Sequence, residues 1–205
     1  SAEDLGKVDA ALSDVAVTAD DKKARCARYD DVRPIFEIGT RRPRVLLFEK
    51  INGFKDTPSV EAAHKAFSNI AQKNGWALAA TDKGGAINAA TLKQFDAIIW
   101  NNVSGDVLTL KQRRALQEYI KAGGGFVAVH GSAGDPYYFW DWYADELIGA
   151  RFIGHPIAPQ FQEARLRVDD GKSALVRGLP AEFLLKDEWY SFQNSPRKTG
   201  AHILL

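Results

Sequence analysis

The chain has 205 residues, 45% of them hydrophobic, and a formal net charge of +1. This length fits one large domain, or one domain with a short extension, and the apolar content is enough for a real core. The near-neutral charge excludes a general attraction to nucleic acid or anionic lipid, and no apolar run approaches the roughly 20 residues of a membrane helix, so we expect neither partner.

Residues 1–44 differ in composition from the rest of the chain and predict a peripheral N-terminal arm. Residues 1–21 hold six acidic side chains and one lysine, whereas residues 22–44 hold eight basic and three acidic ones. They show no long apolar periodicity, which favours at most a short helix. The chain lacks methionine and begins at Ser1 like a mature protein after removal of a leader. We therefore expect a periplasmic or secreted protein, with a cytoplasmic one as the alternative.

From residue 45 onward, apolar runs alternate with amphipathic stretches, which predicts one α/β domain over residues 45–205. Continuous apolar runs predict strands over residues 45–48, 76–80, 97–100 and 126–129. Helical spacing predicts helices over residues 59–73, 91–95, 110–122 and 140–148, with Ser59 as the N-cap of the first. Such alternation with short links is typical of right-handed βαβ units, and hence of a mostly parallel sheet with helices on both faces.

The alternation weakens after Gly149. Residues 164–168 alternate like a half-exposed strand, and residues 202–205 resemble the start of another strand. Because the chain stops within that last element, we expect the domain to be incomplete as given.

Polar side chains gather just after the predicted strands, where ligands bind in open parallel sheets. They are Glu49, Lys50 and Asn52 after the first strand, Asn101 and Asn102 after the third, and His130, Ser132 and Asp135 after the fourth. The alternative for each of them is that loop residues are polar in any case.

His130 follows four apolar residues and precedes a Gly-Ser-Ala-Gly turn. α/β hydrolases and amidotransferases place their nucleophile at such a turn. Ser132 fits that role poorly, because His130 stands where the pattern needs glycine, and the single cysteine, Cys26, lies far upstream. A histidine here suits acid–base chemistry or metal ligation, and the alternative is a hydrogen bond to backbone at the turn.

Two further segments carry candidate site residues. His155 precedes Pro156, which favours an extended exit from its turn. Asp187, Glu188, Trp189 and Tyr190 combine carboxylates with aromatic rings, as sugar-binding sites do. Trp142 and Tyr143 could serve in the same way, although aromatic residues at helical spacing more often fill a core. We treat His64 and His202 as structural.

These residues also carry a resemblance to the ThuA-like, or trehalose-utilisation, family. The matching stretches run from about Val45 to the end and comprise residues 101–106, 123–131, 142–143, 147–156 and 187–192. The resemblance implies a three-layer α/β fold, flavodoxin-like and similar to class I glutamine amidotransferases, with His130 where amidotransferases carry cysteine. We therefore expect no glutaminase activity, and Cys26 to play no part in catalysis.

The chain departs from the family's pattern at two places. Gly53-Phe54 is not followed by the usual histidine, and no histidine precedes Gly178-Leu179-Pro180. Zinc could accept His130 and His155 together with Asp187 or Glu188. Because the histidine after Gly53-Phe54 is missing, however, we expect no tightly held metal and no other cofactor, with a divalent metal such as zinc as the alternative.

The family is associated with disaccharide catabolism through glucosides oxidised at C3. The resemblance thus implies an enzyme acting on a small glycoside or 3-keto-glycoside, a hydrolase or lyase that works by acid–base chemistry. The predicted catalytic residues are His130, His155 and Glu188. The predicted sugar contacts are Asn101, Asn102, Asp135, Trp142, Tyr143, Asp187, Trp189 and Tyr190. The rival hypothesis is a non-catalytic carbohydrate- or partner-binding domain, and a homo-oligomer is compatible with either.

Overall fold

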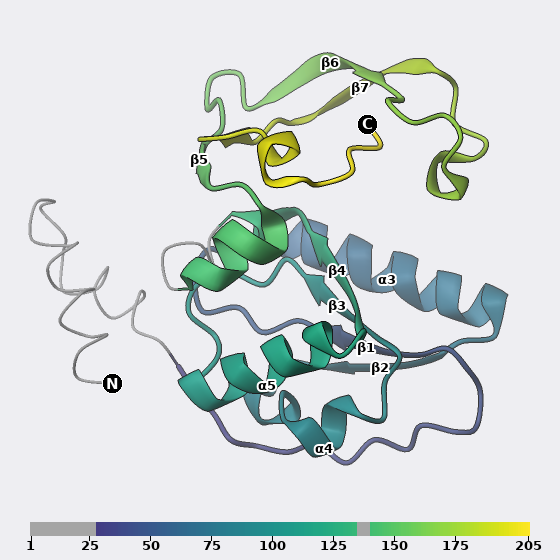
Figure 1. Cartoon of the computed structure of the whole chain (residues 1–205), viewed down its shortest axis with the longest axis vertical. Coiled ribbons are helices and arrows are strands. Elements are labelled where there is room, and N and C mark those ends of the chain that lie inside the picture. The colour runs from purple at the N-terminus through teal and green to yellow at the C-terminus, as the bar shows by residue number, and fades with distance from the viewer. Residues whose placement is uncertain (1–27, 135–139) are drawn as a thin grey trace, which may run out of the picture. The chain divides into compact units, whose positions relative to one another are not determined.

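The computed structural model describes residues 28–134 and 140–205 of the chain (Figure 1). These residues fall into two units, one up to Val127 and one from Ala128 onward, and each is described by itself. The predictions for Cys26 and Asp135 lie outside the described residues.

The first unit is built on a parallel sheet with the strand order β2-β1-β3-β4. The strands are β1 Arg44–Phe48, β2 Ala77–Thr81, β3 Ala97–Asn101 and β4 Gly125–Val129, the last of which crosses the boundary between the units. Each overlaps its predicted strand, and no end differs by more than one residue. Leu46, Ile98 and Trp100 are among the buried residues that form the core. The predicted α/β class with a parallel sheet is therefore confirmed.

Three helices connect these strands: α3 Thr57–Asn74, α4 Ala89–Leu92 and α5 Leu110–Lys121. In Figure 1, α3 lies on one side of the sheet, and α4 and α5 lie on the other. Right-handed crossovers place the helices on opposite faces in this way. The chain moves along the sheet in one direction from β1 to β2, and in the opposite direction from β2 to β3 and β4. A short 3₁₀ helix, η1 Gly84–Ala86, follows β2.

The N-cap predicted for the first helix is wrong. Asp56, not Ser59, caps α3, and its carboxylate accepts a hydrogen bond from the Ser59 amide at 3.3 Å. Pro58 stands in the first turn of α3, where its missing N–H costs nothing. The helix therefore begins two residues earlier than predicted.

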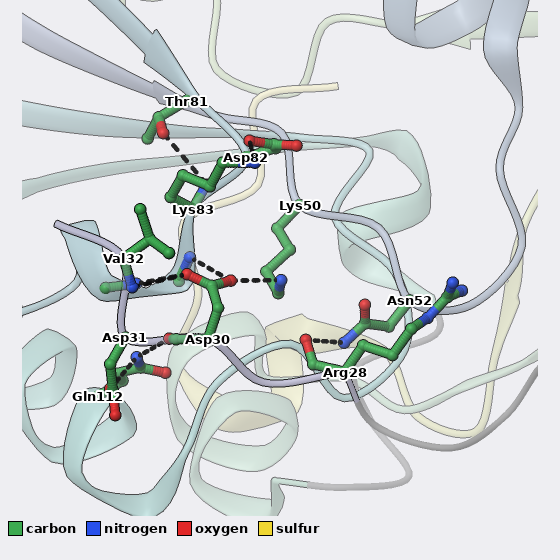
Figure 2. Close-up of polar contacts among 12 residues, drawn as sticks. Arg28, Asp30, Asp31, Val32, Lys50, Asn52, Thr81, Asp82, Lys83 and Gln112 are labelled. Carbon is green, nitrogen blue, oxygen red and sulfur yellow. Dashed lines mark hydrogen bonds and ion pairs between the residues drawn. The ribbon is translucent and has the colours of Figure 1, made fainter. Parts of the chain in front are cut away.

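Side-chain hydrogen bonds fix the segment before β1 to the rest of the first unit (Figure 2). The Asp30 carboxylate accepts from Lys50 Nζ at 2.6 Å and from the amides of Gly84 and Gly85 at 3.0 and 3.3 Å. Gln112 Nε2 donates to the Asp30 carbonyl at 2.8 Å. A Cβ at Gly85 would lie 2.3 Å from the Val32 carbonyl oxygen, so glycine is needed for the backbones to approach this closely.

The second unit contains two antiparallel pairs of strands. β5 Phe152–Gly154 pairs with β8 Ser191–Phe192, and β6 Phe161–Arg167 pairs with β7 Glu182–Glu188. The helical elements are the 3₁₀ helices η2 His130–Ala133, η5 Ala174–Val176 and η6 Pro196–Thr199 and the π-helix η4 Trp142–Ile148.

The sequence predicted this unit less well. β6 overlaps the strand predicted over residues 164–168, and η4 falls within the helix predicted over residues 140–148. The strand predicted over residues 202–205 is wrong, because these residues form no strand in the structure. None of the helices among the described residues is long and apolar enough to cross a membrane.

Candidate functional site

His130 occupies a strained turn. It is the residue directly after β4, it begins η2, and its φ is 45°. A side chain with a Cβ adopts this left-handed conformation at a cost of about 1–2 kcal/mol, because the Cβ comes close to the following carbonyl. Strained residues of this kind cluster at functional sites, where the surrounding structure holds them in place. The sharp turn predicted at His130 is confirmed.

Glu188 lies between His130 and His155. Its Oε2 is 3.3 Å from Nε2 of His130, and its Oε1 is 3.3 Å from Nδ1 of His155. The Glu188 side chain is only 8% exposed, whereas each imidazole is 28% exposed. The structure therefore brings together all three residues predicted to be catalytic, from the end of β4, the loop after β5 and the end of β7.

The contacts assign a proton to one nitrogen of each ring. Nδ1 of His155 lies 2.9 Å from the Pro156 carbonyl oxygen as well as near Glu188, and both of these groups accept hydrogen bonds. Nδ1 of His155 therefore carries hydrogen, and Nε2 holds the lone pair of the neutral ring. Nε2 of His130 faces the Glu188 carboxylate, which favours the hydrogen on that nitrogen and the lone pair of the neutral ring on Nδ1. A carboxylate placed in this way stabilises whichever imidazole gains a proton.

Tyr190 packs against both imidazoles. Its ring is stacked on His155 with centroids 5.8 Å apart and meets His130 edge-on at 4.8 Å. Phe152 lies on Tyr190 with centroids 4.5 Å apart. Tyr190, one of the predicted sugar contacts, thus lies with these two histidines.

Gln160 is a site residue that the sequence did not reveal. Its Nε2 donates to Oε1 of Glu188 at 2.5 Å and so helps to fix the carboxylate. Gln160 lies in the loop before β6, and no residue pattern ties it to Glu188. The pairing of β6 with β7, which places Phe161 opposite Glu188, brings the two together.

The remaining predicted sugar contacts of the second unit are held by structural interactions. Asp187 accepts from the Glu188 amide at 2.8 Å, and Trp189 Nε1 donates to the Gln162 carbonyl at 2.6 Å. Tyr143 is fully buried and donates to the Ser132 carbonyl at 2.7 Å, and Trp142 packs on Trp140. Their role as sugar contacts stays a prediction.

Asn101 and Asn102 belong to the first unit, and both are buried. Asn101 donates to Glu49 Oε1 at 2.7 Å, and Asn102 donates to the Asn101 side-chain oxygen at 2.9 Å. Their role as sugar contacts also stays a prediction. His64, which we expected to be structural, lies against the same Glu49 carboxylate.

His130, His155 and Glu188, three of the side chains named as possible zinc ligands, lie together, and a metal ion bound by them stays a prediction. Within residues 28–134 and 140–205, no group of three or more His, Cys, Asp or Glu side chains is placed to hold one.

Comparison with known proteins bears on the whole domain. No curated protein matches the chain. Among solved structures, a ThuA-like protein from Bacteroides uniformis is 25% identical and superposes with a TM-score of 0.64, covering 80% of this chain and 67% of that one. The family model described as "ThuA: Trehalose utilisation" matches residues 44–205. The chain therefore belongs to the ThuA family, whose description places it in carbohydrate utilisation.

Proposed function

We propose that the protein acts on a small glycoside or 3-keto-glycoside, and that His130, His155 and Glu188 carry out acid–base catalysis. The observation that supports this is one nearly buried carboxylate shared by two partly exposed imidazoles. One imidazole can take a proton while the other gives one, and Glu188 stabilises either cation. Positioned acids and bases of this kind contribute roughly 10²–10⁴-fold to a reaction rate.

The proposed reaction begins at C2 of a sugar whose C3 carries a ketone, since the ketone acidifies the C2–H bond. An unprotonated imidazole removes this proton, and the electron pair left on carbon forms the C1=C2 double bond. The bond between C1 and the glycosidic oxygen then breaks, and that oxygen receives a proton from an imidazolium. This sequence requires no paired-carboxylate glycosidase site and no nucleophile.

The family and the aromatic surroundings of the histidines support the proposed substrate class. Tyr190 presents a ring beside both imidazoles, and aromatic faces commonly pack on the C–H faces of sugars. The family's description as trehalose utilisation makes a disaccharide the first candidate.

The proposal is tested by incubating the whole chain with trehalose and with 3-keto-trehalose and following both by NMR. We expect turnover of the keto-sugar and a loss of about 100-fold in Glu188→Gln, which keeps the shape of the side chain but removes its charge. Glu182→Gln is the matched control, because Glu182 lies at the other end of β7 and pairs with Arg165 and Arg167 on the surface. Saturable binding of either sugar without turnover would instead identify a carbohydrate-binding domain.

A further inference from the structure

A second histidine–carboxylate pair lies in the first unit and uses none of the residues of the proposed function. Nδ1 of His64, in α3, is 3.0 Å from both carboxylate oxygens of Glu49, the residue after β1. Both partners of Nδ1 are acceptors, so Nδ1 carries hydrogen and Nε2 holds the lone pair of the neutral ring. Within the described part of the chain, Nε2 makes no hydrogen bond or ion pair, and the His64 side chain is 47% exposed.

The pair stands at the place where a sheet of this topology binds ligands. Strand β1 lies between β2 and β3, so the chain leaves β1 toward one side of the sheet and later continues from β3 toward the other. Ligands bind outside the carboxyl ends of the strands at such a switch point. Phe48 is in register with Trp100, which sets Glu49 beside Asn101 at the carboxyl ends of β1 and β3.

The carboxylate is held more firmly than in an ordinary surface ion pair, in which both side chains are mobile. The Glu49 side chain is 17% exposed and accepts a hydrogen bond from Asn101 at 2.7 Å. Asn101 is completely buried and is fixed in turn by the Val60 carbonyl and by the Asn102 amide. A buried amide network thus orients one carboxylate toward one accessible imidazole.

This arrangement favours a neutral ligand that donates a hydrogen bond. The Glu49 charge would repel an anion, and the other groups of the network are uncharged amides. A metal ion would need further ligands, and the described residues contain no group able to hold one. A hydroxyl group, by contrast, can donate to Nε2 and can pass its proton there, because Glu49 stabilises the imidazolium that forms.

We propose that Glu49 and His64 form a second acid–base site, at the switch point of the sheet, in which Nε2 of His64 accepts a hydrogen bond or a proton from a hydroxyl group of a carbohydrate. When a proton is passed, the O–H bond breaks, the N–H bond forms, and the electron pair stays on the ligand oxygen. Glu49 is the positioning residue of this site.

The test is NMR of the imidazole nitrogens of the whole ¹⁵N-labelled chain, titrated with trehalose. We expect the Nδ1–H form of His64 and a shift of its Nε2 resonance on addition of trehalose. His202 is the control, since it makes an exposed ion pair with Asp170 and should not respond. An Nε2–H form of His64, or an unchanged resonance at millimolar trehalose, would overturn the proposal.

Variants separate the pair from its surroundings. Glu49→Gln should weaken the response of His64 to trehalose by about tenfold, as expected for the loss of a charge-assisted hydrogen bond. Glu61→Gln, at an exposed position of the same helix, should leave it unchanged. An equal response in Glu49→Gln would contradict the role of the carboxylate. The chain with Glu188→Gln should keep the response, so this inference and the proposed function can fail separately.

Discussion

At the scale of single residues, the backbone of His130 combines a cost in stability with a role in the proposed site. Its φ of 45° is unfavourable for any residue with a Cβ, yet its imidazole meets Glu188 and Tyr190 from this position. A turn residue kept only for stability would be expected to be glycine. The strain thus supports selection for the imidazole at this position.

The strained turn predicts the relative stability of two variants that both lack the imidazole. His130→Gly adopts the left-handed turn without a Cβ, whereas His130→Ala retains the strain, so the glycine variant should be more stable by about 1 kcal/mol. Urea denaturation of the two variants measures this difference. Equal stabilities would contradict this prediction. They would show that the backbone leaves the left-handed conformation when the imidazole is removed, so that the contacts of the imidazole cause the strain.

At the scale of elements, Asp30 joins the segment before β1 to the loops after β1 and β2. Burial raises the pKa of the Asp30 carboxyl, but hydrogen bonds from Lys50 and from the Gly84 and Gly85 amides outweigh burial and hold the pKa below its usual value of 3.8. Because the folded-state pKa is the lower one, the carboxylate stabilises the folded state above pH 3.8, and this contribution is lost as the pH falls through the folded-state value.

The amides that donate to Asp30 should therefore lose protection in acid. We expect the hydrogen-exchange protection factors of Gly84 and Gly85 to be constant down to about pH 4 and to fall by about tenfold below pH 3.8. Asp30→Asn should show the reduced protection at every pH. The Gly125 amide, which donates to the non-titrating Asp96 carbonyl, is the control. A parallel loss at Gly125 would indicate general unfolding instead of the titration of Asp30.

At the scale of the whole molecule, the sequence predicted the first unit far better than the second. The strands of the first unit contain continuous apolar runs, and β1 and β3 each have four consecutive buried residues. Such runs need no knowledge of their partners to be recognised. In the second unit, β7 has the sequence Glu-Phe-Leu-Leu-Lys-Asp-Glu and is mostly exposed. Its apolar and polar residues do not alternate, so the sequence pattern does not identify it as a strand.

The candidate site shows the same difference between local and long-range information. His130 could be found because a strand precedes it and a turn follows it in the sequence. Glu188 could be found because a second carboxylate and two aromatic residues are its neighbours in the sequence. Gln160 and the Glu49–His64 pair could not, because each depends on a contact between elements that only the assembled fold provides. Residue type and spacing thus indicated the histidines and the carboxylate of the candidate site, but not the groups that position them.

The central claim is that the histidines exchange a proton with C2 of a 3-keto-glycoside, and the most direct measurement is the C2–H signal of 3-keto-trehalose in D₂O. With the unmodified chain, we predict that this signal disappears at least as fast as the glycosidic bond breaks. His130→Gly, which should fold, should slow its loss by at least about 100-fold. Cleavage of the glycoside with the C2 proton retained, or an undiminished loss of the signal in His130→Gly, would contradict the account.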